Sequence, residues 1–317
     1  MTYYDVFNGD ADGILSLVQL RRAEPRDATL VTGRKRDIEL LKRVKAEKSD
    51  YVTVLDISMR SNMAELKRIL EAGAQVFYVD HHNAGDIPDH PNLNAVIDTS
   101  PEICTAMLVD EALDGDYRAW AVTAAFGDNF PKLAFAKAEG HELPLEALAR
   151  LGMLVNYNGY GASLEDLHFD PAELYKRLAP FDTPMEFLAE QYETYQALDA
   201  GYEADLTQAQ QSKVLDASRI GTILCLDNNA GARRISGVYG NQLAQENPDK
   251  AHAILTQQDG GFLVSIRAPL SRRSGADTLA LQFETGGGRS AAAGINHLKD
   301  AELSRFIDAF KTAFKSA

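Results

Sequence analysis

The stretch Ala74-Gln-Val-Phe-Tyr-Val-Asp-His-His82 is an apolar run that ends in one carboxylate and two adjacent imidazoles. Other carboxylates follow apolar runs in the same way: Asp10 and Asp12 after Tyr3–Phe7, Asp56 after Tyr51–Leu55, and Asp128 after Trp120–Phe126. Polar side chains just past the carboxyl ends of buried parallel strands converge on one crevice of an α/β sheet. The pattern therefore predicts a parallel α/β domain with one acidic site.

The expected site gathers several negative charges, which require cations. Crowded carboxylates repel one another and raise each other's pKa unless a cation compensates them. We therefore interpret the cluster as a hydrolytic site that binds two metal ions. A calcium-binding loop at Asn8–Gly13 is the alternative, but its twelfth position is Gln19 instead of the required Glu, and we reject it.

Alternating apolar runs and amphipathic segments up to about residue 130 are typical of βαβ units, with further strands expected at Thr29–Thr32 and Asn94–Ile97. Residues Thr183–Ala217 contain almost no Gly or Pro and are predicted to form one long helix. Three later strands are expected at Thr222–Leu226, Ala251–Leu255 and Gly261–Ile266.

These patterns predict a doubly wound parallel α/β domain joined by a helical linker to a smaller α+β domain. We place the first domain at residues 1–182, the linker at 183–217 and the second domain at 218–317. The total of 317 residues is long enough for two domains with their own cores.

Composition limits the localisation of the protein. No apolar run approaches the ~18 residues of a membrane span, and the first residues lack a basic signal-peptide region, so we expect a cytoplasmic protein with no membrane partner. Two cysteines, Cys104 and Cys225, lie far apart in the sequence and are expected to be buried free thiols.

The net charge of −14 restricts the partners. Long nucleic acids bind mainly to basic surfaces, so long duplex DNA or RNA is not an expected partner, whereas a small anionic substrate is. The sequence leaves open whether the chain forms a homodimer. The basic cluster Arg34–Arg36 is either a solvated loop or part of a substrate site, and Asn156–Gly161 is either a loop facing the site or an ordinary interhelical loop.

Taken in order, Asn8–Gly13, Asp56, Asp80–His82 and Asp128 resemble motifs I to IV of the DHH phosphoesterase superfamily. Gly286-Gly-Gly-Arg-Ser-Ala-Ala-Ala-Gly294 is similar to the glycine-rich signature of the DHH-associated C-terminal domain. The superfamily includes nano-RNases, pAp phosphatases and RecJ-like exonucleases. The resemblance implies hydrolysis of phosphate esters of small nucleotides or short oligonucleotides, with two Mn²⁺ ions or, in their place, Mg²⁺ or Co²⁺.

The resemblance also implies metal ligands. Asp10 would bind one ion, Asp56 would bridge both, and the second ion would bind to Asp12, His81 and Asp128. Many relatives have a histidine two or four residues before the first Asp, where this chain has Asn8 and Val6. The amide oxygen of Asn8 is a weaker ligand than imidazole, so we expect the first ion to bind more loosely.

Substrate contacts are implied in both domains. His82 would face the phosphoryl group, and Asp80 would orient an imidazole or a water, so that His82, Asp80 and Asp56 are the expected catalytic residues. Gly286, Gly287 and Gly288 would bring backbone N–H groups close to an anion.

Arginine follows these glycines where relatives usually have histidine, and the Arg289 guanidinium suits a phosphate. Arg267 either lines the cleft or is a solvated arginine on an edge strand. Three functions compete with this interpretation: a single-strand-specific exonuclease, an inorganic pyrophosphatase, and a nucleotide-binding regulatory protein with a degenerate metal site.

Overall fold

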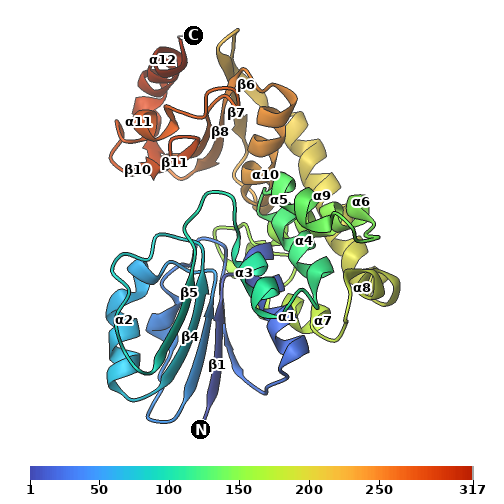
Figure 1. Cartoon of the computed structure of the whole chain (residues 1–317). Helices are drawn as coiled ribbons and strands as arrows, with labels where there is room; N and C mark the ends of the chain where they lie inside the picture. The colour runs from blue at the N-terminus through green and yellow to red at the C-terminus, as the bar shows by residue number, and fades with distance from the viewer. Residues whose placement is uncertain (316–317) are drawn as a thin grey trace. The chain divides into compact units, whose positions relative to one another are not determined.

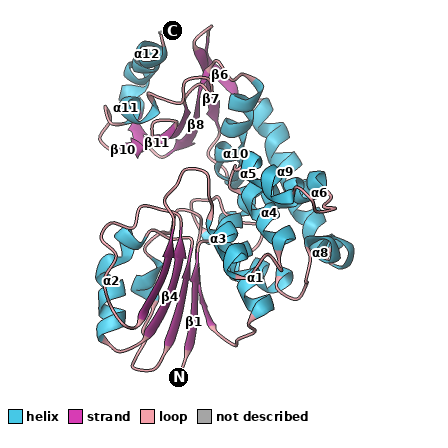
Figure 2. Ribbon diagram, in the orientation of Figure 1, coloured by secondary structure: helices cyan, strands magenta, loops and turns pink. Residues whose placement is uncertain are grey.

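The computed structural model describes residues 1–315, and the chain divides into two compact units between Ala200 and Gly201. The division falls within helix α9 (Tyr192–Gln210), which contributes residues to both units (Figure 1). Each unit combines helices with one sheet (Figure 2). No described helix has both the length and the apolar character required to cross a bilayer.

The first unit is built on a five-stranded sheet with the order β2-β1-β3-β4-β5, in which every neighbouring pair is parallel. In chain order, the strands are β1 (Tyr3–Phe7), β2 (Thr29–Val31), β3 (Tyr51–Leu55), β4 (Gln75–Asp80) and β5 (Leu93–Ile97). The chain moves to one side of β1 for β2 and to the other side for β3. A ligand crevice is therefore expected at the carboxyl ends of β1 and β3.

Helices cover both faces of this sheet, which confirms the predicted doubly wound α/β fold (Figure 1). One face packs on α2 and a 3₁₀ turn, Leu40–Arg43, and the other on α1. The helices of this unit are α1 (Ala11–Ala23), α2 (Met59–Glu71), α3 (Thr105–Ala112), α4 (Arg118–Gly127), α5 (Pro131–Ala138), α6 (Leu145–Asn158), α7 (Pro171–Leu178) and α8 (Pro184–Glu190).

A buried ion pair fixes α1 against the sheet. Arg21 donates to Asp5 at 2.6 and 2.8 Å and to the Thr53 hydroxyl at 2.9 Å. Removing one partner from a buried pair leaves an uncompensated charge, which costs about 3–5 kcal/mol. The pair therefore fixes the last turn of α1 against the middle of β1 and β3.

The second unit contains a six-stranded mixed sheet with the order β10-β11-β9-β8-β7-β6. Its strands are β6 (Lys213–Ala217), β7 (Gly221–Leu226), β8 (Ala251–Gln258), β9 (Gly261–Arg267), β10 (Gly286–Gly288) and β11 (Ala292–Lys299). Its further helices are α10 (Ala230–Glu246), α11 (Ala276–Ala280) and α12 (Leu303–Phe314). The three strands predicted in this region are β7, β8 and β9, and α12 packs Phe306 and Phe310 into their core.

The prediction of one helix over Thr183–Ala217 is wrong. The segment contains α8, α9 and the strand β6, with a break at Gln191, where α8 ends. β6 pairs antiparallel with β7, and Leu215 packs against the second core. Strand pairing and burial therefore override the helical composition of the last residues.

Both cysteines are buried free thiols, as predicted. Cys104 precedes α3 in the first unit, and Cys225 lies in β7 of the second. Burial raises the pKa of both thiols, most strongly that of Cys104, so neither resembles an activated nucleophile.

Candidate metal centre

Three carboxylates surround the ring of His81. The Nε2 atom of His81 lies 3.6 Å from Asp56 Oδ1, 3.8 Å from Asp12 Oδ2 and 3.9 Å from Asp128 Oδ2. Two donors that each bind an ion at about 2.1 Å lie roughly 3–4 Å apart, so these separations suit ligands of one cation. We call these four groups the His81 side of the site.

The other ring nitrogen of His81 fixes its tautomer. Nδ1 lies 2.9 Å from the carbonyl oxygen of Ile103, which can only accept a hydrogen bond. Nδ1 therefore donates to this carbonyl, and Nε2 is the ring nitrogen that faces the carboxylates and could bind an ion. This arrangement matches a histidine prepared to bind a metal ion.

Each carboxylate on the His81 side lies at the end of a helix or strand. Asp12 lies in the first turn of α1 and accepts hydrogen bonds at 2.8 Å from the backbone N–H groups of Thr105 and Ala106, at the start of α3. Asp56 follows β3 in a left-handed conformation with φ of 59°, which is uncommon outside glycine and typical of functional sites. Asp128 ends helix α4, so the apolar run Trp120–Phe126 forms a helix and not a strand.

The crowding of these groups alters their pKa values. Burial raises the pKa of Asp56 well above its ordinary range, and the negative charges of Asp12, Asp10 and Asp128 raise it further. Burial also raises the pKa of Asp12, against the opposing effect of His81. Within residues 1–315, no lysine or arginine forms an ion pair with Asp12 or Asp56. The chemistry of this donor set fits a divalent cation, which would supply the missing charge.

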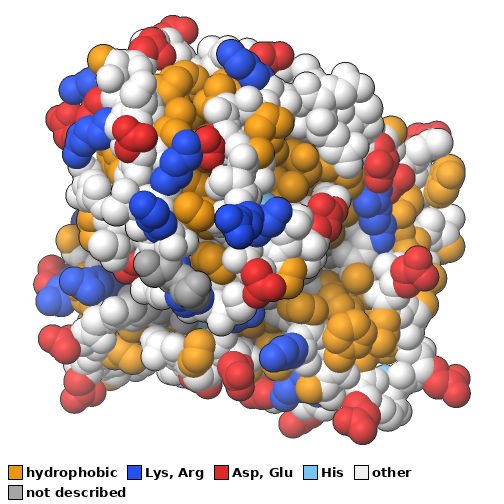
Figure 3. Space-filling model, turned by 90° about the horizontal axis from the view of Figure 1, so that it is seen from above, with side chains coloured by type: hydrophobic (Ala, Val, Ile, Leu, Met, Phe, Trp, Pro, Cys, Tyr) orange, Lys and Arg blue, Asp and Glu red, His pale blue; other side chains and the backbone are white. Residues whose placement is uncertain are grey.

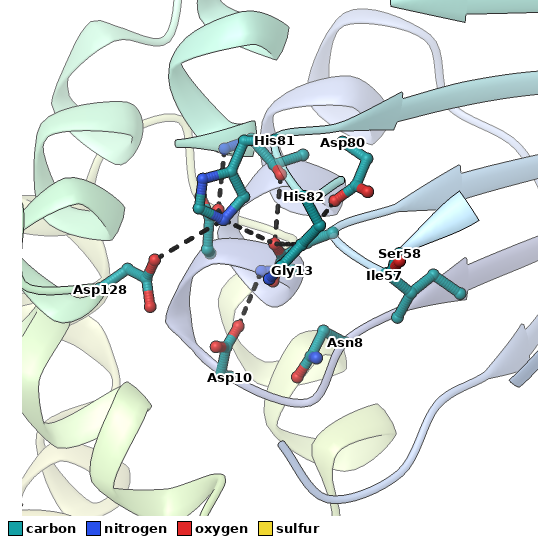
Figure 4. A network of polar contacts seen from close by, with 12 residues as sticks. Asn8, Asp10, Gly13, Ile57, Ser58, Asp80, His81, His82 and Asp128 are labelled. Carbon is teal, nitrogen blue, oxygen red and sulfur yellow. Dashed lines mark hydrogen bonds and ion pairs between the residues drawn. The ribbon is translucent and has the colours of Figure 1, made fainter. Parts of the chain in front are cut away.

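His82 leaves the same strand end and is held by Asp80. Oδ1 of the fully buried Asp80 lies 2.7 Å from His82 Nδ1. Both side chains are labelled in Figure 4. His82 is more exposed, at 31% of its side chain, against 8% for His81. The two adjacent histidines therefore differ: one is enclosed by carboxylates, and the other is oriented by a carboxylate and reaches solvent.

A lysine lies on the opposite side of the cluster. The Lys35 ammonium is 2.6 Å from Asp10 Oδ2, 3.0 Å from Asp128 Oδ1 and 3.0 Å from Asn156 Oδ1. We call these four groups the Lys35 side. Burial alone would lower the pKa of Lys35, but the charges of Asp10, Tyr160 and Asp128 raise it well above its ordinary value.

Asp10 and Asn8 both contact Lys35. Asp10 caps α1 by accepting from the Gly13 N–H at 3.1 Å; burial alone would raise its pKa, but Lys35 lowers it. A side chain at Gly13 would collide with the backbone of Asn8, so close packing, not an unusual φ angle, requires glycine there. The buried Oδ1 of Asn8 lacks a hydrogen-bond partner among residues 1–315, and the side chain lies near Asp10 in Figure 4.

Lys35 and Asn156 lie in two segments, Arg34–Arg36 and Asn156–Gly161, for which the sequence left a role at the site open. Lys35 lies in the basic cluster that was left open between a solvated loop and a substrate site. Asn156 lies in the last turn of α6, and the next glycine, Gly159, packs against the backbone of Gly9 and Asp10. Of the two alternatives for Asn156–Gly161, the structure favours a segment that faces the site.

The glycine-rich segment of the second unit is part of its sheet. Gly286–Gly288 forms the edge strand β10, paired antiparallel with β11. Side chains at Gly286 and Gly288 would overlap the backbone of Ala280 and Ala293, so these glycines are required by close packing. The predicted contact of these glycines with an anion would therefore involve an edge strand, and it stays a prediction.

The two arginines of the second unit have different surroundings. Arg289 is exposed in the turn between β10 and β11. Arg267 is half-buried and donates to Asn241 Oδ1 at 2.6 Å, to Ser265 Oγ at 2.9 Å and to the Gly237 carbonyl at 3.2 Å. Arg267 therefore joins β9 to α10 and is not a solvated arginine.

Solved structures share this architecture. A RecJ exonuclease bound to manganese matches with a TM-score of 0.62 and 18% identity, covering 100% of this chain and 90% of the other. The DHH domain of a member of a family of ribosomal proteins matches with a TM-score of 0.64 and 14% identity, covering 98% of this chain and 86% of the other.

The fold is that of the DHH-domain proteins. A pGpG-specific phosphodiesterase, PggH from Vibrio cholerae, also has this fold, with a TM-score of 0.57, 16% identity and 99% coverage of both chains. No protein-family profile and no curated protein sequence matches the chain. The DHH fold agrees with the resemblance found in the sequence motifs.

Proposed function

We propose that the chain is a divalent-cation-dependent phosphoesterase that acts on phosphate esters of small nucleotides or short oligonucleotides. The observation that supports this most directly is the His81 side, where an imidazole nitrogen and three carboxylates converge at ligand-to-ligand distances. The DHH fold, shared with a RecJ exonuclease and a pGpG-specific phosphodiesterase, supports the same class of reaction.

The hard carboxylate oxygens and one imidazole suit Mn²⁺, with Mg²⁺ or Co²⁺ as substitutes. Such an ion, when bound, supplies an activated water and positive charge for the phosphoryl oxygens. Asp12, Asp56, His81 and Asp128 would hold it. Asp80 would keep His82 oriented, so that the imidazole contacts the phosphoryl group while negative charge develops.

The proposed substrate is small because the chain is acidic overall. On the face seen in Figure 3, acidic and basic side chains are interspersed among apolar ones. We propose that Arg289, exposed in its turn, binds a terminal phosphate of the substrate. A longer single strand, as cut by an exonuclease, would require more cationic contacts than this one arginine.

A turnover assay with Mn²⁺ tests the proposal. The substrates are linear dinucleotides, cyclic dinucleotides, phosphoadenosine phosphate, pyrophosphate and single strands of increasing length. Release of nucleoside monophosphates from dinucleotides supports the proposal. Preference for long strands would instead identify an exonuclease, and binding without turnover would identify a regulatory protein.

Two variants separate the proposed roles. His82→Gln should lower kcat by roughly 10²–10³-fold, as expected for losing one donor to developing charge. Arg289→Ala should raise KM by roughly 10–150-fold, which corresponds to ~1.5–3 kcal/mol for a charged hydrogen bond. Arg219→Ala, an exposed arginine in the β6–β7 turn of the same sheet, is the matched control and should change neither constant.

A further inference from the structure

Lys35 is held at the site by its own backbone. Its N–H donates to the Gly159 carbonyl at 2.9 Å, and its carbonyl accepts from Asn8 Nδ2 at 3.2 Å. The neighbouring Arg34 pairs with Asp37 at 2.6 Å, which further restrains the loop after β2. The side chain of Lys35 therefore starts from a fixed point and reaches the carboxylates in a defined direction.

The ammonium group uses its full hydrogen-bonding capacity. An ammonium has three N–H donors, and three oxygens lie within 3.0 Å of Nζ, on Asp10, Asp128 and Asn156. Two of these oxygens belong to carboxylates. The Lys35 side is thus a compact oxygen site that already contains a positive charge.

Asp128 contacts both sides of the cluster. Its Oδ1 faces Lys35 at 3.0 Å, and its Oδ2 faces His81 at 3.9 Å. One carboxylate therefore serves both sides, as a carboxylate between two neighbouring cations would. A divalent ion bound to Asp10 Oδ2 and Asp128 Oδ1 would have to displace the ammonium, because Lys35 Nζ already lies between these two oxygens.

We propose that the Lys35 ammonium replaces one of the two metal ions, so that the chain holds a single divalent ion at Asp12, Asp56, His81 and Asp128. This inference rests on the proposed function for the presence of an ion on the His81 side, and it changes the expected number of ions. Lys35 then acts as a charge-compensating and positioning residue that holds Asp10 and Asp128 in place. The substitution of Asn for His at position 8 is consistent with this arrangement, since no ion requires an imidazole there.

Metal counting on the full chain tests the inference. Metal-free protein is titrated with Mn²⁺ by calorimetry, bound metal is measured by elemental analysis after desalting, and paramagnetic resonance distinguishes an isolated ion from a coupled pair. Wild type should bind one ion per chain and show the spectrum of an isolated ion. Two tight ions and a coupled spectrum in wild type would overturn the proposal, without need of any variant.

A neutral substitution should create the second site. Lys35→Met has similar length without charge and should bind two ions, the second of them with help from the unpartnered Asn8 oxygen. Lys35→Arg keeps the positive charge, so this variant should still bind one ion per chain. Lys42→Met, a lysine paired with Glu39 at 57% side-chain exposure, is the control and should also stay at one. A folded Lys35→Met protein that still binds a single ion would contradict the proposal.

Turnover measured on the same samples separates the two conclusions. A wild-type chain that binds one ion but hydrolyses none of the phosphate esters would refute the proposed function and leave the ion count standing. A chain that hydrolyses dinucleotides with two bound ions would keep the function and refute the role of Lys35.

Discussion

The His81 side and the Lys35 side of the cluster are made from similar oxygens but are compensated differently. On the His81 side, Asp12 and Asp56 are buried and have no ion pair with lysine or arginine among residues 1–315. On the Lys35 side, Asp10 pairs with an ammonium at 2.6 Å. The difference teaches that one carboxylate cluster can combine a candidate metal site with a cationic side chain from its own chain.

The pKa directions of the two sides reflect this difference. Asp56 and Asp12 have raised pKa values because burial and neighbouring negative charge disfavour ionisation. The pKa of Asp10 is lowered, although burial alone would raise it, because Lys35 compensates its charge. The side without a cation of its own is therefore the one that an external cation would stabilise more.

The largest effect is expected from His81→Ala. His81 belongs to both groups of described residues that could hold a metal ion, so its removal should weaken Mn²⁺ binding by more than the ~10–100-fold typical of losing a supporting residue, and turnover should be abolished. His141→Ala, which removes an exposed histidine, is the control and should leave both unchanged. Tight Mn²⁺ binding in the His81 variant would show that the His81 side does not hold the ion.

An intermediate effect is expected from Asp10→Asn, which removes one of the two carboxylates that contact Lys35. Asparagine caps a helix as well as aspartate does, so α1 should remain formed while the ion pair with Lys35 is lost. We expect Mn²⁺ to bind with an affinity within roughly tenfold of wild type, and kcat to fall by less than in the His82 variant. Loss of the ion in this variant, measured by calorimetry, would mean that the two sides are not separate.

Much of the first unit could be predicted from sequence because its strands are short apolar runs bounded by polar turns. β1 and β3 begin and end where the pattern places them, and β4 and β5 shift by one residue at one or both ends. The prediction of one helix over Thr183–Ala217 was wrong because β6 is defined by its pairing with β7. Local composition does not report such a pairing.

The same limit applies to the site. Carboxylates and histidines at strand ends could be predicted to converge, since parallel strands present their carboxyl ends at one edge. Lys35 could not be placed, because a lysine in a basic loop has no distinguishing local pattern. Its role depends on Asp128 and Asn156, which are supplied by α4 and α6 far along the chain.

The smallest effect concerns stability without metal. A carboxyl group with a raised pKa holds its proton more tightly in the folded state, so its contribution to stability is lost as the pH rises from the ordinary value of 3.8 through the raised one. Asp56→Asn removes this group, and asparagine tolerates the left-handed φ of 59°. The metal-free variant should therefore be more stable than wild type, by a margin that grows as the pH rises above 3.8.

Thermal unfolding in the presence of a chelator measures this margin, since ~1 kcal/mol shifts the melting temperature by roughly 2–4 °C in a protein domain of 150–250 residues. The exposed Asp86→Asn variant is the control and should show no pH-dependent gain. Saturating Mn²⁺ should reverse the order, because a bound ion stabilises only the chain that keeps its ligand. If the metal-free Asp56 variant is no more stable than wild type at high pH, the negative charge of the His81 side is already compensated. The contrast between the His81 side and the Lys35 side would then not hold.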